Sequence, residues 1–421
     1  MHFIYNILIS IATFFLWCTQ FFSKKMKLFV EGRKDVFEKL NREISENDKT
    51  IWFHCASLGE FEQGVPIMER VKKMFPKQKL LVTFFSPSGY EIKKNTKLAD
   101  VTAYLPLDTK ANAEKFIQIV NPSLVIFVKY EIWPNYLFTL QKRSIPTLLV
   151  SGLFRENQLF FKGYGTFMRK ALQTFNHIFV QDNASEALLN DIKISNVTVS
   201  GDTRFDRVSH QIEQDNTLDF IESFKGESLC VVCGSTWPED EAVLEKYINE
   251  APKNVKFIIA PHKIDTSKIE SFRKNFQKES ILFSEIQKTK ILEELSAYHI
   301  LIIDTIGLLT QIYSYADVAY VGGAMGNTGL HNILEPATFG VPIVIGENFE
   351  KFPEAKKLQR LAGLFSVQNA SEASEILAKL IDDKNFRNKT GMINGHFINS
   401  NTGATKIVMD YIETLNRDGL V

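Results

Sequence analysis

The sequence predicts an α/β protein with two domains, each built around a parallel β-sheet. Short apolar runs alternate with longer amphipathic segments, which is typical of strands joined by crossover helices. The alternation stops at the polar segment 211–227 and then starts again, so this segment is the predicted linker. The 421 residues are enough for two or three domains of ordinary size.

The composition is that of an ordinary globular protein. Lys plus Arg and Asp plus Glu are both 49, so no excess of positive charge indicates a nucleic-acid partner. Cys230 and Cys233 form a C-x-x-C pair inside an apolar run, and no second pair accompanies them. Because structural zinc sites usually have two such pairs, buried strand cysteines are favoured over a metal site.

Residues 1–27 are predicted to form a membrane anchor. The segment Phe3–Phe22 contains no charged residue and is long enough to cross a bilayer, and Lys24, Lys25 and Lys27 follow it. The positive-inside rule then places the rest of the chain in the cytoplasm. Several polar side chains also allow a tilted or partly embedded anchor, and a buried core helix is the alternative. These polar residues are Asn6, Ser10, Thr13, Thr19 and Gln20.

Residues 28–210 are predicted to form the first domain. Its predicted strands are 50–55, 79–85, 101–107, 123–128, 146–150 and 177–180, and residues 108–120 are a predicted helix. In parallel sheets of this kind, ligands bind beyond the carboxyl ends of the strands.

Polar residues follow several of these strands. Glu60 lies in the predicted first turn of a helix, where the helix dipole is expected to keep it ionised, as suits a general base. An ordinary first-turn glutamate is the alternative. Ser86 and Pro87 suit a helix cap. Glu131 would either act in the site or form a buried ion pair with Lys129. Arg204 would either supply a fixed cation near the site or form a surface salt bridge. 

Residues 228–400 are predicted to form the second domain, and residues 401–421 a C-terminal helix. The predicted strands are 228–233, 255–260, 300–303, 318–321 and 341–345, with a helical pattern over 371–415.

The stretch 316–347 carries the strongest ligand signal. A buried strand runs into a glycine-rich loop and then a predicted helix, with Asn332 as its candidate cap. Free N–H groups and the helix dipole would favour a phosphate there, and Glu335 would accept hydrogen bonds from ribose hydroxyls. An ordinary strand–helix turn is the alternative.

Two α/β halves around a cleft, with nucleotide features in the second, describe the GT-B glycosyltransferase architecture. The sequence has no P-loop, no dinucleotide fingerprint after the first strand and no nucleophile elbow. No predicted strand ends in Asp-x-Asp, the divalent-metal signature of the other main glycosyltransferase fold. We therefore expect neither a metal nor another cofactor.

Seven motifs, in order along the chain, resemble the 3-deoxy-D-manno-octulosonic acid (Kdo) transferases of lipopolysaccharide synthesis, glycosyltransferase family 30. They are 57–60 (SLGE), 86–89 (SPSG), 131–135 (EIWPN), 201–206 (GDTRFD), 234–236 (GST), 304–307 (DTIG) and 322–336, which ends in HNILEP.

The resemblance implies an inverting transfer of Kdo from CMP-Kdo to a lipid A precursor, lipid IVA, on the cytoplasmic side of the inner membrane. Glu60 matches the family's general base, and Glu131 and Arg204 match positions that stabilise the transition state. The positions matching CMP-contacting segments are Pro261, His262, Ile306, Gly307, Leu308, Asn332, Ile333, Leu334 and Glu335. Further substrate contacts are expected from Ser57, Gly59, Ser88, Ser235, Thr236 and His331.

The chain departs from the family pattern at two of these positions. His262, with Lys263 next to it, stands where the family often has arginine, and Leu308 stands where it often has glutamate. Two alternatives remain open: a membrane-associated GT-B transferase that uses a UDP-sugar and a lipid-linked acceptor, and a nucleotide- or lipid-binding homologue without catalytic activity.

Overall fold

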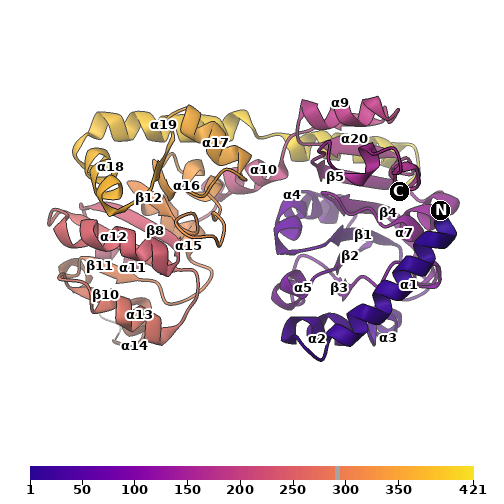
Figure 1. Cartoon of the computed structure of the whole chain (residues 1–421), viewed down its shortest axis with the longest axis horizontal. Coiled ribbons are helices and arrows are strands. Elements are labelled where there is room, and N and C mark those ends of the chain that lie inside the picture. The colour runs from indigo at the N-terminus through magenta and orange to yellow at the C-terminus, as the bar shows by residue number, and fades with distance from the viewer. Residues whose placement is uncertain (290–293) are drawn as a thin grey trace. The chain divides into compact units, whose positions relative to one another are not determined.

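The structure is a computed structural model that describes residues 1–289 and 294–421. The chain divides into two compact units (Figure 1). Unit 1 comprises residues 1–207 and 402–421, and unit 2 comprises residues 208–401. The last helix, α20 (Ala404–Arg417), therefore belongs to unit 1.

Unit 1 is built on a seven-stranded sheet in which every pair of neighbouring strands is parallel. The strands are β1 (Thr50–Cys55), β2 (Lys79–Phe84), β3 (Val101–Tyr104), β4 (Pro122–Val128), β5 (Thr147–Gly152), β6 (His177–Val180) and β7 (Val197–Val199). The helices before α20 are α1 (His2–Thr19), α2 (Lys24–Glu31), α3 (Val36–Glu43), α4 (Leu58–Met74), α5 (Pro87–Lys93), α6 (Lys110–Val120), α7 (Pro134–Lys142), α8 (Thr166–Leu172), α9 (Asn183–Asp191) and α10 (Thr203–His210), which crosses into unit 2.

The strand order of this sheet is β3-β2-β1-β4-β5-β6-β7, the Rossmann order. The order reverses between β1 and β4, which pair directly, with Phe53 opposite Ile126. Ligands of such sheets bind at this reversal, beyond the carboxyl ends of the strands.

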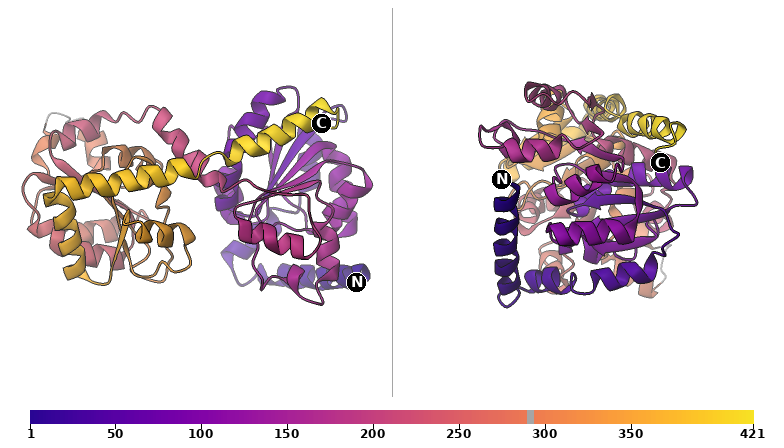
Figure 2. Two further views of the ribbon diagram at one scale, coloured as in Figure 1. Left: turned by 90° about the horizontal axis from the view of Figure 1, so that it is seen from above. Right: turned by 90° about the vertical axis from the view of Figure 1, so that its right-hand side faces the viewer.

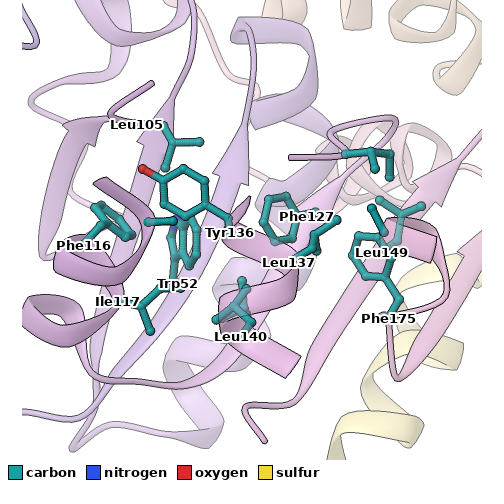
Figure 3. Close-up of a cluster of buried hydrophobic side chains, with 14 of the residues drawn as sticks. Trp52, Leu105, Phe116, Ile117, Phe127, Tyr136, Leu137, Leu140, Leu149 and Phe175 are labelled. Carbon is teal, nitrogen blue, oxygen red and sulfur yellow. The ribbon is translucent and has the colours of Figure 1, made fainter. Parts of the chain in front are cut away.

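Both faces of the sheet are covered by helices, so its strands are apolar on both sides. On one face Trp52 packs against Phe127 and against Tyr136 of α7 (Figure 3). On the other face α4 and α20 contribute Ile67 and Ile412 to a second buried cluster. The C-terminal helix thus completes the core of unit 1.

Unit 2 repeats the design with a second seven-stranded parallel sheet, in the order β10-β11-β9-β8-β12-β13-β14. The strands are β8 (Leu229–Thr236), β9 (Val255–Pro261), β10 (Ser280–Leu282), β11 (Ile300–Ile302), β12 (Val318–Val321), β13 (Ile343–Gly346) and β14 (Leu364–Val367). The helices are α11 (Asp219–Lys225), α12 (Pro238–Glu250), α13 (Thr266–Arg273), α14 (Phe283–Thr289), α15 (Leu309–Ile312), α16 (Leu334–Thr338), α17 (Pro353–Arg360), α18 (Ala370–Asp382) and α19 (Lys384–Ser400). Its order reverses between β8 and β12.

The predicted strands are confirmed, with differences at their ends. The bounds of β1, β6 and β12 agree with the prediction, whereas β3 ends at Tyr104, three residues before the predicted end. The outer strands β7, β10 and β14, of three or four residues each, were not predicted. Cys230 and Cys233 lie buried in β8, as expected of strand cysteines.

The N-terminal apolar segment forms the helix α1, with a mean hydropathy of 1.5. None of its residues is buried, so the alternative of a buried core helix is wrong. By its length and composition, α1 could cross a membrane.

Candidate active site

Glu60 is fixed at the start of α4 by a capping box. Ser57 is the N-cap, and its backbone N–H donates to Glu60 Oε2 at 2.8 Å. The spacing Ser-x-x-Glu before an apolar helix face predicts this local structure. The side chain is nevertheless only 8% exposed, because α4 packs onto the sheet from its first turn.

Burial and, to a smaller extent, the neighbouring charge of Glu131 together raise the pKa of Glu60 to about 7. Hydrogen bonds from the backbone at Ser57 and the charge of Lys129 act in the opposite direction but are weaker. The expectation that the helix terminus keeps Glu60 fully ionised is therefore wrong. A carboxyl group with a pKa near neutrality can both accept and release a proton, as general base catalysis requires.

Glu131 lies beyond β4, and it comes near Glu60 because β4 pairs with β1. Glu131 Oε2 accepts a hydrogen bond from Trp133 Nε1 at 2.8 Å and lies 3.3 Å from His54 Nε2. Sequence alone suggested an ion pair with Lys129; the partners found for the carboxylate are His54 and Trp133.

His54 was not predicted as a site residue. It is fully buried in β1, and its Nδ1 lies 2.8 Å from Thr83 Oγ1, which also accepts from Trp52 Nε1 at 2.7 Å. These contacts hold the imidazole in place beside the Glu131 carboxylate. The signal in the sequence was a single histidine in the apolar run 50–55.

Arg204 lies in the first turn of α10 and pairs with the buried carboxylate of Asp202 rather than with a surface one. Its Nε donates to Asp202 Oδ2 at 2.8 Å, and Gln63 Nε2 donates to Asp202 Oδ1 at 3.3 Å. Gln63 lies one turn after Glu60 on α4, so these bonds tie Arg204 to the helix that carries Glu60. Neither Asp202 nor Gln63 was singled out from the sequence.

The remaining unit 1 candidates surround the start of α4. A Cβ on Gly59 would meet nothing within 4 Å, so the space beside this residue is open. Ser86 caps α5 as expected and Pro87 occupies its first turn, while Ser88 Oγ lies 2.9 Å from Ser86 Oγ. 

In unit 2 three rings cluster beyond the carboxyl ends of β8, β9 and β12. The ring centroids of Trp237 and His262 lie 4.6 Å apart, and those of His262 and His331 lie 4.4 Å apart. Trp237 Nε1 donates to His331 Nε2 at 3.1 Å. Burial lowers the pKa of both histidines, that of His331 to about 4, so both rings are neutral at physiological pH. Trp237 was not predicted as a member of this cluster.

The glycine-rich loop is folded around an internal carboxylate. Asp240 Oδ2 accepts from the backbone N–H of Gly323 at 2.8 Å and of Trp237 at 2.9 Å, and Asp240 Oδ1 accepts from Tyr320 at 2.9 Å. The N–H of Gly323, which the sequence made available to a phosphate, is thus already in use. 

The helix after this loop also differs from the expectation. The helix α16 has five residues, and Ile333, one position after the predicted cap Asn332, precedes it without a side-chain capping bond. Asn332 Oδ1 accepts from the N–H of Leu334 at 3.1 Å, so the Asn332 side chain makes the predicted capping contact. A helix this short has a small dipole, so any phosphate contact there would depend mainly on individual donors.

Glu335 joins two of the predicted CMP-contacting segments. Its Oε1 accepts from Asn332 Nδ2 at 3.0 Å and its Oε2 from Thr310 Oγ1 at 3.1 Å. Thr310 lies on α15, directly after the loop of Ile306, Gly307 and Leu308. Ile306 is 86% exposed, and Gly307 has φ +106°, which favours glycine.

The last three candidates lie at the ends of β8 and β9. Ser235 has φ +55°, and Thr236 Oγ1 donates to Glu241 Oε1 at 3.1 Å. Pro261 ends β9 opposite Thr236, whose carbonyl accepts from the N–H of His262. Among the residues that the structure describes, no group of three or more His, Cys, Asp or Glu side chains could hold a metal ion.

Two Rossmann-type units with polar residues at both strand-order reversals define a GT-B glycosyltransferase fold. Solved structures agree: UDP-GlcNAc 2-epimerase from Neisseria meningitidis, bound to UDP-GlcNAc, is 16% identical, with 87% of this chain and 100% of that chain covered and a TM-score of 0.60. A putative UDP-N-acetylglucosamine 2-epimerase from Listeria monocytogenes is 13% identical, with 88% and 97% covered and a TM-score of 0.58. At these identities the similarity concerns the fold.

Sequence comparison gives the family. Residues 32–207 match the family model described as 3-deoxy-D-manno-octulosonic-acid transferase (kdotransferase). The Kdo transferase of Aquifex aeolicus is 27% identical, covering 83% of this chain and 92% of that protein, and that of Haemophilus influenzae is 26% identical, covering 86% of each. A bifunctional glycosyltransferase/methyltransferase of Fusobacterium nucleatum is 26% identical over 90% of this chain, which spans 59% of that longer protein. Residues 32–207 therefore carry a domain of the Kdo transferase family, and most of the chain is similar to Kdo transferases, which supports a glycosyltransferase.

Proposed function

We propose that this protein transfers Kdo from CMP-Kdo to a lipid A precursor, lipid IVA, with inversion at the anomeric carbon, in lipopolysaccharide synthesis. The observation that carries the proposal is Glu60: a buried carboxyl group with a pKa near 7, beside Glu131 at the strand-order reversal of unit 1. The similarity to Kdo transferases supports the choice of Kdo as the transferred sugar, and the donor and acceptor are part of the proposal.

The proposed reaction is a single displacement. Glu60 removes the proton from an acceptor hydroxyl as that oxygen forms a bond to the anomeric carbon of Kdo. The bond between this carbon and the phosphate oxygen breaks, and CMP leaves with the bonding electron pair. The anomeric carbon becomes positively charged in the transition state, so the Glu131 carboxylate would stabilise it. Arg204 would stabilise negative charge, either on a substrate group or on the phosphate oxygen as CMP leaves.

In this proposal unit 1 binds the acceptor and unit 2 binds the donor. The CMP contacts would come from Pro261 and His262, from the loop 306–308 and from residues 332–335, with Glu335 accepting hydrogen bonds from ribose. Ser235, Thr236 and His331 would line the same region. The single phosphate of CMP can be held by individual donors, so the proposed reaction needs no metal ion. The helix α1 would keep the enzyme at the inner membrane, on its cytoplasmic side.

The test is mass spectrometry of lipid IVA after incubation with the protein and freshly made CMP-Kdo. We expect a product heavier by one or more Kdo residues, and none when UDP-sugars replace CMP-Kdo. Turnover of a UDP-sugar, with none of CMP-Kdo, would overturn the proposal in favour of a different GT-B transferase.

A second arm tests the role of Glu60. Glu60→Ala should reduce transfer to near background while calorimetry still detects CMP binding. Full activity of this variant would remove Glu60 from the proposed role. CMP binding without transfer in the unaltered protein would favour the binding homologue.

A further inference from the structure

The helix α1 contacts unit 1 along one side only. Its partly buried residues recur at the three- and four-residue spacing of a helix face. They are Tyr5, Asn6, Ile9, Thr13, Leu16, Thr19 and Gln20, with Cys18 at the margin. Most of the polar side chains of the segment therefore face the protein, which inverts the pattern of a helix on a soluble surface.

Hydrogen bonds attach the first turn of α1 to buried groups of unit 1. The Tyr5 hydroxyl donates to Asp108 Oδ2 at 2.6 Å, and Asn135 Nδ2 donates to Asn6 Oδ1 at 2.9 Å. His2 Nε2 lies 2.7 Å from Asn135 Oδ1. Asp108 and Asn135 are almost completely buried, so these bonds place the beginning of the helix firmly on the domain.

The other end of α1 is also held to unit 1, through α2. Phe29 of α2 is buried against the ring of Phe85, with ring centroids 5.2 Å apart. Arg33, just beyond α2, donates from Nε to the carbonyl of Leu105 at 2.9 Å and from Nη2 to the carbonyl of Phe85 at 2.6 Å. The helix thus runs along unit 1 from the region of α7 to α2 (Figures 1 and 2).

The outward side of α1 is strongly apolar. Half of the exposed large hydrophobic side chains of the described residues lie within the first 22 positions. They are Met1, Phe3, Ile4, Ile7, Leu8, Ile11, Phe14, Phe15, Trp17, Phe21 and Phe22. Lys24, Lys25 and Lys27 follow at once and are exposed. An apolar face with aromatic rings and flanking lysines matches an anionic lipid surface.

A spanning orientation conflicts with these contacts. At 1.5 Å per residue the 18 residues of α1 extend about 27 Å, so a spanning helix would put its two ends on opposite sides of the bilayer. Both ends instead rest on the same folded unit. We propose, building on the proposed membrane location, that α1 lies in the plane of an anionic membrane surface, with its outward face among the lipid head groups and upper acyl chains and its polar face on unit 1.

This orientation would place the candidate site beside the membrane. Asp108 follows β3, Asn135 lies four residues after Glu131, and Arg33 bonds to the segments that follow β2 and β3. The helices α1 and α2 therefore contact the edge of the sheet that carries Glu60 and Glu131. A lipid-borne acceptor would reach this edge without leaving the membrane.

The test measures the depth of spin labels along α1 in vesicles of phosphatidylethanolamine and phosphatidylglycerol. Cysteines would replace Ile4, Ile11 and Phe15 on the outward face and Ile9 and Leu16 on the inward face, in a Cys18→Ser background. We expect similar, shallow depths at the three outward sites and several-fold lower accessibility to lipid-dissolved oxygen at the inward sites. A depth profile that peaks at Ile11, whatever the face, would establish a spanning helix and overturn the inference.

A charge variant tests the lipid surface independently. Since each lysine near an anionic surface contributes about 1 kcal/mol, Lys24→Gln, Lys25→Gln and Lys27→Gln together should weaken vesicle binding by about a hundredfold. The matched control, Lys351→Gln with Lys384→Gln and Lys389→Gln, removes exposed lysines of unit 2 and should bind as the unaltered protein does. Equal binding by both triple variants, or no binding by the unaltered protein, would overturn the inference. Failure of Kdo transfer in detergent would instead contradict the proposed function, whatever the depth profile.

Discussion

Replacing Glu60 by glutamine should stabilise the protein at alkaline pH while abolishing transfer. Folding raises the pKa of this carboxyl from 4.5 to about 7, mainly through burial. At 1.36 kcal/mol per pH unit, the rise corresponds to about 3 kcal/mol. Because the pKa of the folded state is the higher one, the carboxyl's favourable contribution is complete below pH 4.5 and is lost as the pH rises through 7. Glutamine resembles the protonated form and can keep the capping box.

The measurement is the free energy of unfolding of unit 1 in urea at pH 5 and at pH 8. Glu60→Gln should exceed the unaltered protein by about 3 kcal/mol at pH 8 and by less than about 1 kcal/mol at pH 5. Glu69→Gln, which changes an exposed glutamate of the same helix, serves as the control and should show little difference at either pH. Equal stability of Glu60→Gln and the unaltered protein at pH 8 would refute the reasoning that burial perturbs this group.

Three further predictions concern activity and binding. In the unaltered enzyme kcat/KM should fall about tenfold per pH unit below pH 7. Glu131→Gln should shift this acid limb of the pH profile to lower pH without restoring an ordinary glutamate pKa, since burial is the larger cause of the raised pKa of Glu60. An unshifted acid limb would contradict an effect of Glu131 on Glu60. His54→Gln should lower kcat at least tenfold with CMP affinity unchanged in calorimetry, because the imidazole contacts Glu131 and the proposed CMP contacts come from unit 2; a weakened CMP affinity would argue for general misfolding. Trp237→Leu should weaken CMP binding about tenfold by releasing both histidine rings, and unchanged affinity would separate this ring cluster from the donor site.

Chelation gives one more prediction, since the proposed mechanism uses only side chains and backbone donors. Transfer should continue at its full rate in excess EDTA. Complete loss of activity that Mg²⁺ restores would contradict a metal-free reaction.

Local signals in the sequence predicted local structure well. Glu60 lies in the first turn of α4 as predicted, and β12 has its predicted bounds, because a helix start or a buried strand depends on a few neighbouring residues. The failures were non-local. The pKa of Glu60 depends on burial and on Glu131, 71 positions away, and Gly323 donates to Asp240, 83 positions away. A pattern of neighbouring residues cannot show which residues 71 or 83 positions apart come close together.

By itself the sequence determined the alternation of strands and helices, the motifs of the Kdo transferase family and the apolar N-terminal helix, since each depends on residue type and short-range spacing. Only the tertiary structure decided that β1 pairs with β4 and that His54 contacts Glu131. It also decided that Asp240 accepts a hydrogen bond from the glycine-rich loop, and which side of α1 faces the protein. The physical reason is that strand order and burial are set by packing the whole sheet between its helices. That packing brings residues far apart in the chain within hydrogen-bonding distance and removes them from water.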